Sequence, residues 1–282
     1  MKKLIIAAAL IFAVQANAQI KTPQPSLKAE IEQTVGLTNV SVDYFRPAKK
    51  GRLVFGDLVP YGKVWRTGAN ENTTVTIDTD IEINGQNLAP GKYALYTIPK
   101  AEMWDVIFYK TTDNWGLPKN WNENDVVLKA SVKPETLTKD VEYFTIDVTP
   151  NNNNEGTLNI YWEKTIVHVP FNVPTHKIAM ESINANINEN AKASDYYAAG
   201  TYLFSVNQDI DKALKYVNKA IDMQEGEAPF YMLRQKSLIQ AATGDKKGAV
   251  ETAEKSLKGA EKAGNDDYIK MNRNSILEWS KS

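Results

Sequence analysis

The sequence predicts two unlike folded parts, an antiparallel β-sandwich followed by a small α-helical repeat domain. Between about residues 20 and 173, apolar and polar residues alternate with the period of half-buried strands. From Ser194 onward the apolar residues recur at the helical period. Composition changes at the same place, because eleven of the twelve prolines and five of the six tryptophans lie at or before Pro174. We therefore expect a β domain at 19–173, a linker at 174–191 and a helical domain at 192–282.

The β domain is expected to contain about nine strands joined by turns. Val75 and Ile77, for example, alternate with polar neighbours. Asn84-Gly85 is a hairpin signal, because a tight turn of this type needs positive φ at both central positions. The expected strands are 40–44, 74–78, 81–83, 93–98, 104–109, 126–133, 144–148, 158–162 and 166–171.

Residues 1–18 have the three parts of a secretory signal peptide. Lys2 and Lys3 supply the positive start, Leu4 to Val14 form an apolar run of eleven residues, and Ala16-Asn17-Ala18 supplies a cleavage pattern. An apolar helix of this length spans roughly 16 Å, which is too short for a bilayer core of about 30 Å. We therefore expect export, to the periplasm, the outer membrane surface or the medium, without a membrane span.

Five helices are expected after the linker, and the linker itself has loose helical spacing at Ile178, Ser182 and Ala185. The expected helices begin at Ser194 or Asp195, after Asp209, near Ala228, at Asp245 and near Asp267. Gly244 is suited to end the third of them.

The helical domain also contains an internal repeat. The residues from Asp209 to Ala213 resemble those from Gly244 to Ala249, and paired helices at a period of about 36 residues resemble tetratricopeptide repeats. In this resemblance Ala213 and Ala249 take the small position of each second helix, and Ser237 and Gly200 or Thr201 take that of each first helix. We expect two repeats and a terminal helix, a form that suits a protein partner.

Composition excludes several kinds of site. The chain has no cysteine, so it has no disulfide, thiolate nucleophile or cysteine-bound zinc, and His168 and His176 are too few for a multi-histidine metal centre. The balance of 33 basic and 34 acidic residues argues against a nucleic-acid surface. None of the phosphate-loop, nucleophile-elbow or metalloprotease motifs occurs. We expect no metal and no cofactor.

One segment, residues 44–74, is denser in function-type residues than its surroundings, with six basic and only two acidic residues. Its arginines have the fork geometry that binds a carboxylate, phosphate or sulfate. Its aromatic rings suit a sugar or another planar ligand, and its amide and carboxylate side chains suit hydroxyl groups. The candidate ligand-binding residues are Arg46, Arg52, Tyr61, Trp65, Arg66, Asn70 and Glu71.

A structural role for the same segment is an open alternative. In that interpretation Arg46 and Arg66 pair with Asp57 and Glu71, and Trp65 belongs to the core. Two further tryptophans, Trp115 and Trp121, occupy an expected surface loop. They form either an aromatic platform for a saccharide or a plug at the sandwich edge.

Several runs of residues are specific enough to compare with known families. They are Arg46-Pro47, Gly51-Arg52, Phe55-Gly56, Val59-Pro60-Tyr61-Gly62, Val64-Trp65-Arg66-Thr67-Gly68-Ala69-Asn70, Gly91-Lys92-Tyr93-Ala94-Leu95-Tyr96-Thr97-Ile98-Pro99 and Leu158-Asn159-Ile160-Tyr161-Trp162-Glu163. These runs resemble the bacterial family catalogued as domain of unknown function 2911, over most of residues 30–170. The resemblance implies an exported β-rich domain, typically from bacteria of the Bacteroidetes type and sometimes followed by helical repeats. It implies no reaction.

Three classes of function fit these residues. The first is a non-catalytic binding or scaffolding module of the cell envelope, with a protein partner on the helices and a saccharide or small anion on the β domain. The second is an envelope hydrolase or carbohydrate-binding protein acting through residues 46–74, in which Glu71 and Asp57 would supply acid–base chemistry. The third is a structural envelope protein without a ligand. We expect the first, because the sequence contains no recognisable catalytic set.

Overall fold

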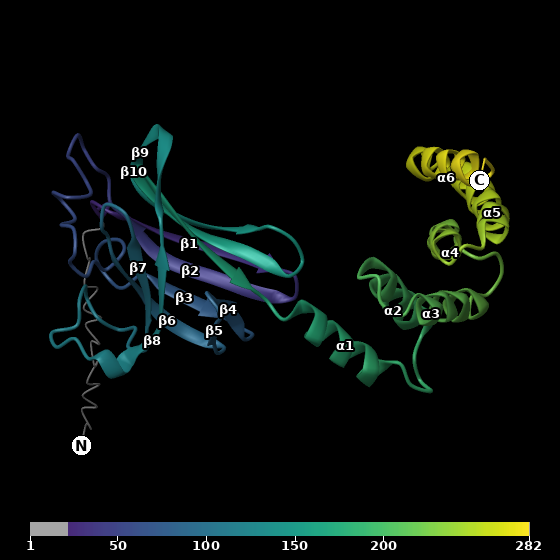
Figure 1. Ribbon diagram of the computed structural model, residues 1–282, viewed down its shortest axis with the longest axis horizontal. Helices are drawn as coiled ribbons and strands as arrows, with labels where there is room; N and C mark the ends of the chain where they lie inside the picture. Colours follow the sequence, from purple (N-terminus) through teal and green to yellow (C-terminus); the bar gives the residue numbers. More distant parts are fainter. Residues whose placement is uncertain (1–21, 282) are drawn as a thin grey trace, which may run out of the picture. The chain divides into compact units, whose positions relative to one another are not determined.

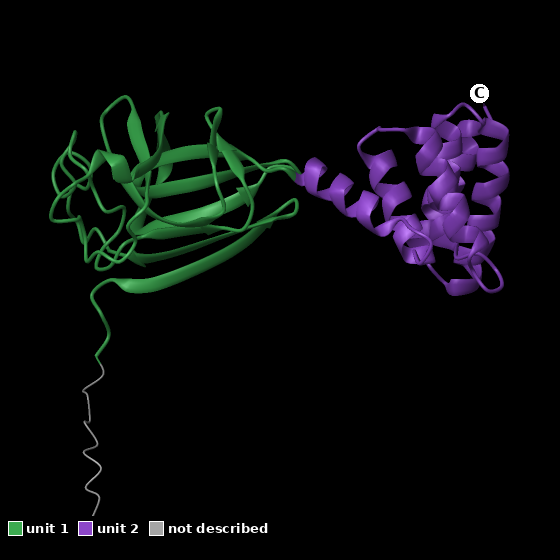
Figure 2. Cartoon of the chain, turned by 90° about the horizontal axis from the view of Figure 1, so that it is seen from below, with its two compact units in different colours: residues 1–174 green, residues 175–282 purple. Residues whose placement is uncertain are grey.

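The structure is a computed structural model that describes residues 22–281, and it contains two β-sheets and, after them, six α-helices (Figure 1). One compact unit ends at Pro174 and the other begins at Thr175 (Figure 2). The predicted fold class, an antiparallel β region followed by a helical region, is confirmed. The signal peptide expected at residues 1–18 lies outside the described residues.

The β unit is built from a six-stranded and a four-stranded sheet, and every pair of neighbouring strands is antiparallel. The first sheet has the order β1 (Leu27–Val35), β2 (Thr38–Arg46), β3 (Thr74–Ile77), β6 (Gly91–Ile98), β7 (Trp104–Tyr109), β8 (Val126–Val132). The second has the order β5 (Gln86–Leu88), β4 (Ile81–Ile83), β10 (Glu155–Asn172), β9 (Pro134–Pro150). A short 3-10 turn, Glu123–Asp125, precedes β8.

The main core lies between the two sheets. Alternate residues of each strand point into it, which is why Val75 and Ile77 are buried there while their neighbours belong to the other face of β3. Large rings fill its centre, among them Trp104, Phe144 and Trp162, each no more than 1% exposed. The face of the six-stranded sheet that does not contact this core is called the outer face below.

The expected strands differ from the structure in several places. The segments 158–162 and 166–171 form one strand, β10, whose register with β9 shifts on both sides of Glu163, a residue with φ of +53°. Such a bulge interrupts the alternation without ending the strand. None of the expected strands covers β1, although Ala29, Ile31 and Val35 alternate there with polar residues and face the core. As an edge strand β1 has only Val35 fully buried.

The helical unit contains α1 (Thr175–Asn186), α2 (Ala193–Ser205), α3 (Ile210–Asp222), α4 (Phe230–Ala242), α5 (Lys246–Ala263) and α6 (Asp266–Trp279). Two of these helices begin at aspartates that cap them as the sequence predicts. The Asp209 carboxylate accepts a hydrogen bond from the backbone N–H of Lys212 at 3.2 Å, and that of Asp245 accepts one from Gly248 at 2.9 Å. The expected linker, 174–191, contains α1.

Small residues allow the helices of this unit to approach closely. Gly200 of α2 faces α3, where a Cβ atom would lie 2.8 Å from the carbonyl oxygen of Ala213. Leu203, Val217 and Ile239 form the buried centre of this unit. Within residues 22–281, no helix has both the length and the apolar character needed to cross a membrane.

Candidate functional site

The chain between β2 and β3 is long, but main-chain hydrogen bonds hold it against the sheets. The backbone N–H of Gly62 donates to Pro99 O at 2.8 Å. Trp65 and Thr97 exchange two backbone hydrogen bonds, of 2.7 and 3.0 Å, where Trp65 continues the sheet beyond the end of β3. The segment that the sequence singles out is therefore an anchored part of the β unit.

The structure does not gather the candidate arginines on a common site. Arg46 donates from Nε to Phe144 O at 3.0 Å and from Nη2 to Thr145 Oγ1 at 2.7 Å. Arg52 donates to two carbonyl oxygens of its own loop, both at 2.8 Å. Arg66 donates from Nη1 to Asn70 O at 3.0 Å. All three guanidinium groups therefore bind main-chain carbonyls, whereas the structural alternative expected pairs with Asp57 and Glu71.

Trp65 belongs to the edge of the main core. Its indole stacks on Trp162 with ring centroids 6.1 Å apart, and its ring contacts the edge of Phe144 at 5.1 Å. Tyr61, by contrast, is 48% exposed and covers Gly56. These two candidate aromatic residues therefore do not form one stacking platform.

Asn70 and Glu71 are adjacent in sequence but have different surroundings. Asn70 has a positive φ of 57° and donates from Nδ2 to Gln24 Oε1 at 3.3 Å, so it helps to hold the chain before β1. Glu71 is exposed and makes no hydrogen bond or ion pair with the rest of residues 22–281. Glu71 lines a pocket on the outer face of the β unit, and no other candidate of the seven does; Trp65 and Arg66 line a separate hollow beside Trp115.

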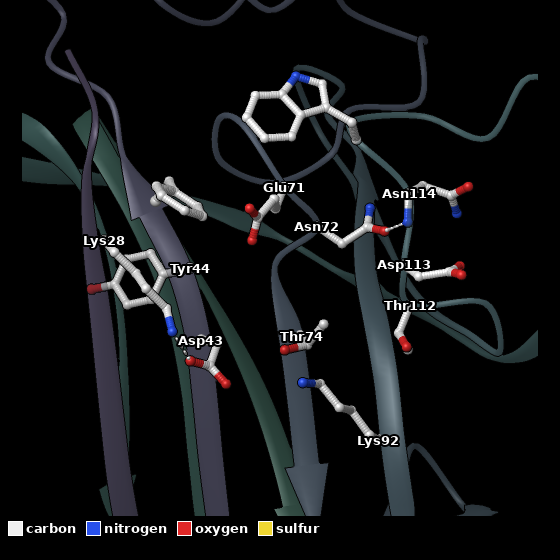
Figure 3. A pocket seen from close by; sticks show the side chains of 12 residues that line it. Lys28, Asp43, Tyr44, Glu71, Asn72, Thr74, Lys92, Thr112, Asp113 and Asn114 are labelled. Carbon is white, nitrogen blue, oxygen red and sulfur yellow. Dashed lines mark hydrogen bonds and ion pairs between the residues drawn. The ribbon is translucent and has the colours of Figure 1, made fainter. Parts of the chain in front are cut away.

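This outer-face pocket has a volume of about 370 Å³ (Figure 3). It lies on β1, β2, β3 and β6, under the loops that precede β3 and follow β7, and it falls within the roughly 300–1,000 Å³ typical of small-molecule sites. Its lining residues are Lys28, Asp43, Tyr44, Phe45, Glu71, Asn72, Thr74, Lys92, Thr112, Asp113, Asn114 and Trp115.

Strand register explains why the floor of the pocket is polar. Asp43 is opposite Thr74 across β2 and β3, and Thr74 is opposite Ala94 across β3 and β6. Lys92 is opposite Thr76, one step along the same face. Residues that face one another across antiparallel strands project from the same side. Asp43, Thr74 and Lys92 therefore share one face of the sheet, with Thr74 between Asp43 and Ala94.

Two groups on this floor lack partners within residues 22–281. The Thr74 side chain is buried, with the residue only 4% exposed, yet its Oγ1 makes no hydrogen bond. Lys92 is exposed and its ammonium group has no hydrogen bond or ion pair. A buried hydroxyl without a partner costs free energy, which a ligand group that bonds to it would recover.

Asn72 holds the wall of the pocket in place. Its Nδ2 donates to Tyr96 Oη at 2.8 Å and to Gly116 O at 2.9 Å, while its Oδ1 accepts from the backbone N–H of Asn114 at 2.9 Å. Asn72 is 6% exposed, so these bonds are shielded from water. They fix the loop that carries Trp115, a residue that is 67% exposed.

The pocket contains charges of both signs. Lys28 forms an ion pair with Asp43, with 2.9 Å between Nζ and Oδ1. The hydrogen bond that Lys28 donates to the Asp43 carboxylate raises the pKa of Lys28, and the nearby charge of Glu71 acts in the same direction. Asp113 on the opposite wall is exposed and has no partner among the described residues. Residues 22–281 contain no group of His, Cys, Asp or Glu arranged to hold a metal ion.

Sequence reasoning found Glu71 and considered Trp115, but it missed Thr74 and Lys92. The alternation that placed Val75 and Ile77 in the core also put Thr74 on the opposite face. That signal did not reveal a pocket, because its walls come from loops 66–73 and 110–117, which meet only in the folded unit.

The helical unit has a second hollow, on α2 and α3. Its volume is about 690 Å³, and its apolar part includes Leu214 and the rings of Tyr196 and Tyr216, whose centroids are 5.7 Å apart. Lys215 and Asp211 also line it. Here the tyrosines that sequence reasoning assigned to helix packing are in part accessible.

Comparison with known protein families gives a match over the β unit. The family model described as "Protein of unknown function (DUF2911)" matches residues 26–171, a range that includes every residue of the outer-face pocket. No curated protein matches the sequence.

Proposed function

This chain belongs to the DUF2911 family of proteins of unknown function, and we propose that its β unit is a non-catalytic binding module for a small polar ligand. The observation that carries this proposal is the outer-face pocket with the unpartnered Thr74 hydroxyl on its floor. A buried hydroxyl without a hydrogen bond does not stabilise the fold. A bound ligand that accepts a hydrogen bond from it would be stabilised by that bond. The accessible Trp115 ring beside it supplies an apolar surface for the same ligand.

The hydrolase alternative has less support from the geometry. Acid–base catalysis by Glu71 and Asp57 needs both carboxylates on one substrate. Glu71 lines the outer-face pocket and Asp57 does not, and both side chains are exposed. Binding without a reaction needs no such pair.

A test of the binding proposal uses Thr74→Val, which removes the hydroxyl but keeps the shape of the side chain. Ligand-detected NMR would be run on the purified protein with free amino acids, dipeptides, neutral hexoses and hexuronic acids. We expect one of these classes to bind, with weaker binding to Thr74→Val and Trp115→Ala. Lys63→Gln, which alters an exposed lysine outside the pocket, is the matched control and should bind as the wild type does. Absence of binding by every class, or equal binding by all variants, contradicts the proposal.

For the helical unit we propose tetratricopeptide-like repeats that bind a protein partner. Helix pairing and the small residues at Gly200, Ala213 and Ala249 support the repeat assignment, and the α2–α3 hollow supports the partner. A partner isolated with the wild-type protein should be lost with Leu214→Glu and kept with Lys63→Gln. Retention by both variants would contradict a role for this hollow.

Export to the cell envelope is the third part of the proposal. It is supported by the charge, apolar run and small-residue pattern of residues 1–18. When the full chain is expressed in a Gram-negative host, the mature protein should be found outside the cytoplasm and should begin at Gln19. An intact N-terminus on cytoplasmic protein would contradict export.

A further inference from the structure

The outer-face pocket presents unpaired charges of both signs. Lys92 has a free ammonium group, while Glu71 and Asp113 have carboxylates without a hydrogen bond or ion pair in residues 22–281. Lys28 and Asp43 neutralise each other as an ion pair. A ligand that fills this pocket must therefore meet one positive and two negative groups that it partly shields from water.

These charges are separated along the strands. Lys92 is opposite Thr76, and Thr74 lies two residues earlier on the same face of β3. Glu71 precedes Thr74 by three more residues, in the loop above. Figure 3 shows Thr74 between Glu71 and Lys92, with Asp113 on the wall formed after β7. At about 3.3 Å per residue along a strand, the five residues from Thr76 back to Glu71 span at most about 17 Å of backbone, and the Lys92 side chain reaches toward Thr74 within this span (Figure 3).

We propose that the ligand is a small zwitterion of dipeptide size, an inference that rests on the proposed binding function of this pocket. Its carboxylate binds the Lys92 ammonium group and accepts a hydrogen bond from Thr74 Oγ1. Its ammonium group binds at the end of the pocket that carries Glu71 and Asp113. An apolar side chain of the ligand covers the exposed ring of Trp115.

Charge complementarity favours this ligand over the neutral sugar that an exposed tryptophan would otherwise suggest. A neutral sugar removes water from Lys92, Glu71 and Asp113 without supplying an opposite charge to any of them. A simple anion satisfies Lys92 and Thr74 but brings a like charge near the two carboxylates. A zwitterion supplies an opposite charge to each end of the pocket.

The test compares L-leucyl-L-leucine with two blocked analogues by titration calorimetry on the purified protein. N-acetylation removes the ammonium charge, and amidation of the C-terminus removes the carboxylate charge. We expect the free dipeptide to bind at least about tenfold more tightly than either analogue, since each block removes a charge-assisted hydrogen bond.

Variants of the pocket residues test which protein group binds each end of the ligand. Lys92→Gln should weaken the free dipeptide about tenfold and leave the C-terminal amide unchanged, because the amide has no carboxylate to lose. Glu71→Gln combined with Asp113→Asn should weaken the free dipeptide and leave the N-acetyl analogue unchanged. Lys63→Gln, the control outside the pocket, should bind all three compounds as the wild type does.

Equal affinity of the wild type for the free and blocked dipeptides would overturn the zwitterion proposal. If methyl glucoside or glucuronate binds instead, and Thr74→Val weakens that binding, the binding function is supported while the zwitterion is excluded. If none of these compounds binds, the zwitterion proposal fails and the binding function loses its support as well.

Discussion

The indoles of Trp65 and Trp162 stack on each other, with 6.1 Å between the ring centroids and 17° between the planes. Trp162 is 1% exposed and lies in the centre of the main core. The contact therefore joins the long segment between β2 and β3 to the four-stranded sheet. It makes Trp65 a packing residue of the β unit, whereas the sequence alone left a ligand-stacking role open.

Replacement of Trp65 by alanine should lower the free energy of unfolding by about 3 kcal/mol, because the change removes a large ring from the core edge. Tyr61→Ala, at a neighbouring residue that is 48% exposed, should cost less than about 1 kcal/mol. Urea unfolding followed by tryptophan fluorescence measures both. Similar losses for the two variants would show that Trp65 does not support the core.

Arg46 and Arg52 should differ in how much each side chain stabilises the fold. Arg46→Met should lower the free energy of unfolding by about 2 kcal/mol, because Phe144 O and Thr145 Oγ1 lose a charged donor in a half-buried place. Arg52→Met should cost less than about 1 kcal/mol, since water can replace a donor on an exposed loop. Chemical denaturation of both variants checks the difference. A larger loss for Arg52→Met would contradict these assignments.

The order of strands and helices was largely predictable from sequence, because each element with one buried face keeps its period. Val75 and Ile77 of β3 and the Asp209 cap of α3 are examples. The failures occurred where burial is unusual. The bulge at Glu163 breaks the period of β10, and the apolar face of the edge strand β1 is only partly buried.

The candidate site was less predictable than the fold. The sequence identifies an arginine as a hydrogen-bond donor but does not reveal which acceptors it binds. In the structure Arg46, Arg52 and Arg66 all bind main-chain carbonyls. In the sequence Thr74 and Lys92 look like ordinary residues of alternating strands. They become pocket residues only because two loops enclose them in the folded unit. Glu71 was found because it lies in the dense segment, although its neighbours in space are distant in sequence.

Asn72→Asp tests the wall of the outer-face pocket. The substitution is nearly isosteric, but it replaces the Nδ2 donor that binds Gly116 O at 2.9 Å with an oxygen. Two acceptors then face each other in a buried place, so we expect a loss of about 2–3 kcal/mol in the free energy of unfolding. Hydrogen exchange should speed up at amides 112–117 and stay unchanged in β1. Unchanged exchange at 112–117 would contradict the role of Asn72 in holding this loop.

Gly200→Ala tests the close approach of α2 and α3. The new Cβ would lie 2.8 Å from Ala213 O and 2.7 Å from a methyl carbon of Val217, so the helices must separate. We expect a loss of about 2 kcal/mol in the free energy of unfolding of the helical unit, despite the higher helix propensity of alanine. Ala198→Ser, on the exposed side of α2, should cost about 0.5 kcal/mol or less. Circular dichroism during urea unfolding measures both, and a stabilising Gly200→Ala would exclude the tight packing.

The ionisation of Asp105 should make the free energy of unfolding depend on pH. Burial alone would raise its pKa, but hydrogen bonds from Lys100, Ser131 and Lys129 outweigh burial and hold the pKa of Asp105 below its ordinary value of 3.8. The two lysine Nζ atoms lie 3.0 and 3.2 Å from Asp105 Oδ2. Because the folded pKa is lower than the unfolded one, the ionised carboxylate stabilises the folded state.

This contribution is complete above the unfolded pKa, near pH 3.8, and it is lost as the pH falls from there through the folded value. Asp105→Asn should therefore be less stable than the wild type by about 1–2 kcal/mol at neutral pH, and the difference should shrink below pH 3.8. Urea unfolding of both proteins at a series of pH values measures this difference. A difference that stays constant into the acid range would mean that the lost stability comes from packing and not from the charge of Asp105.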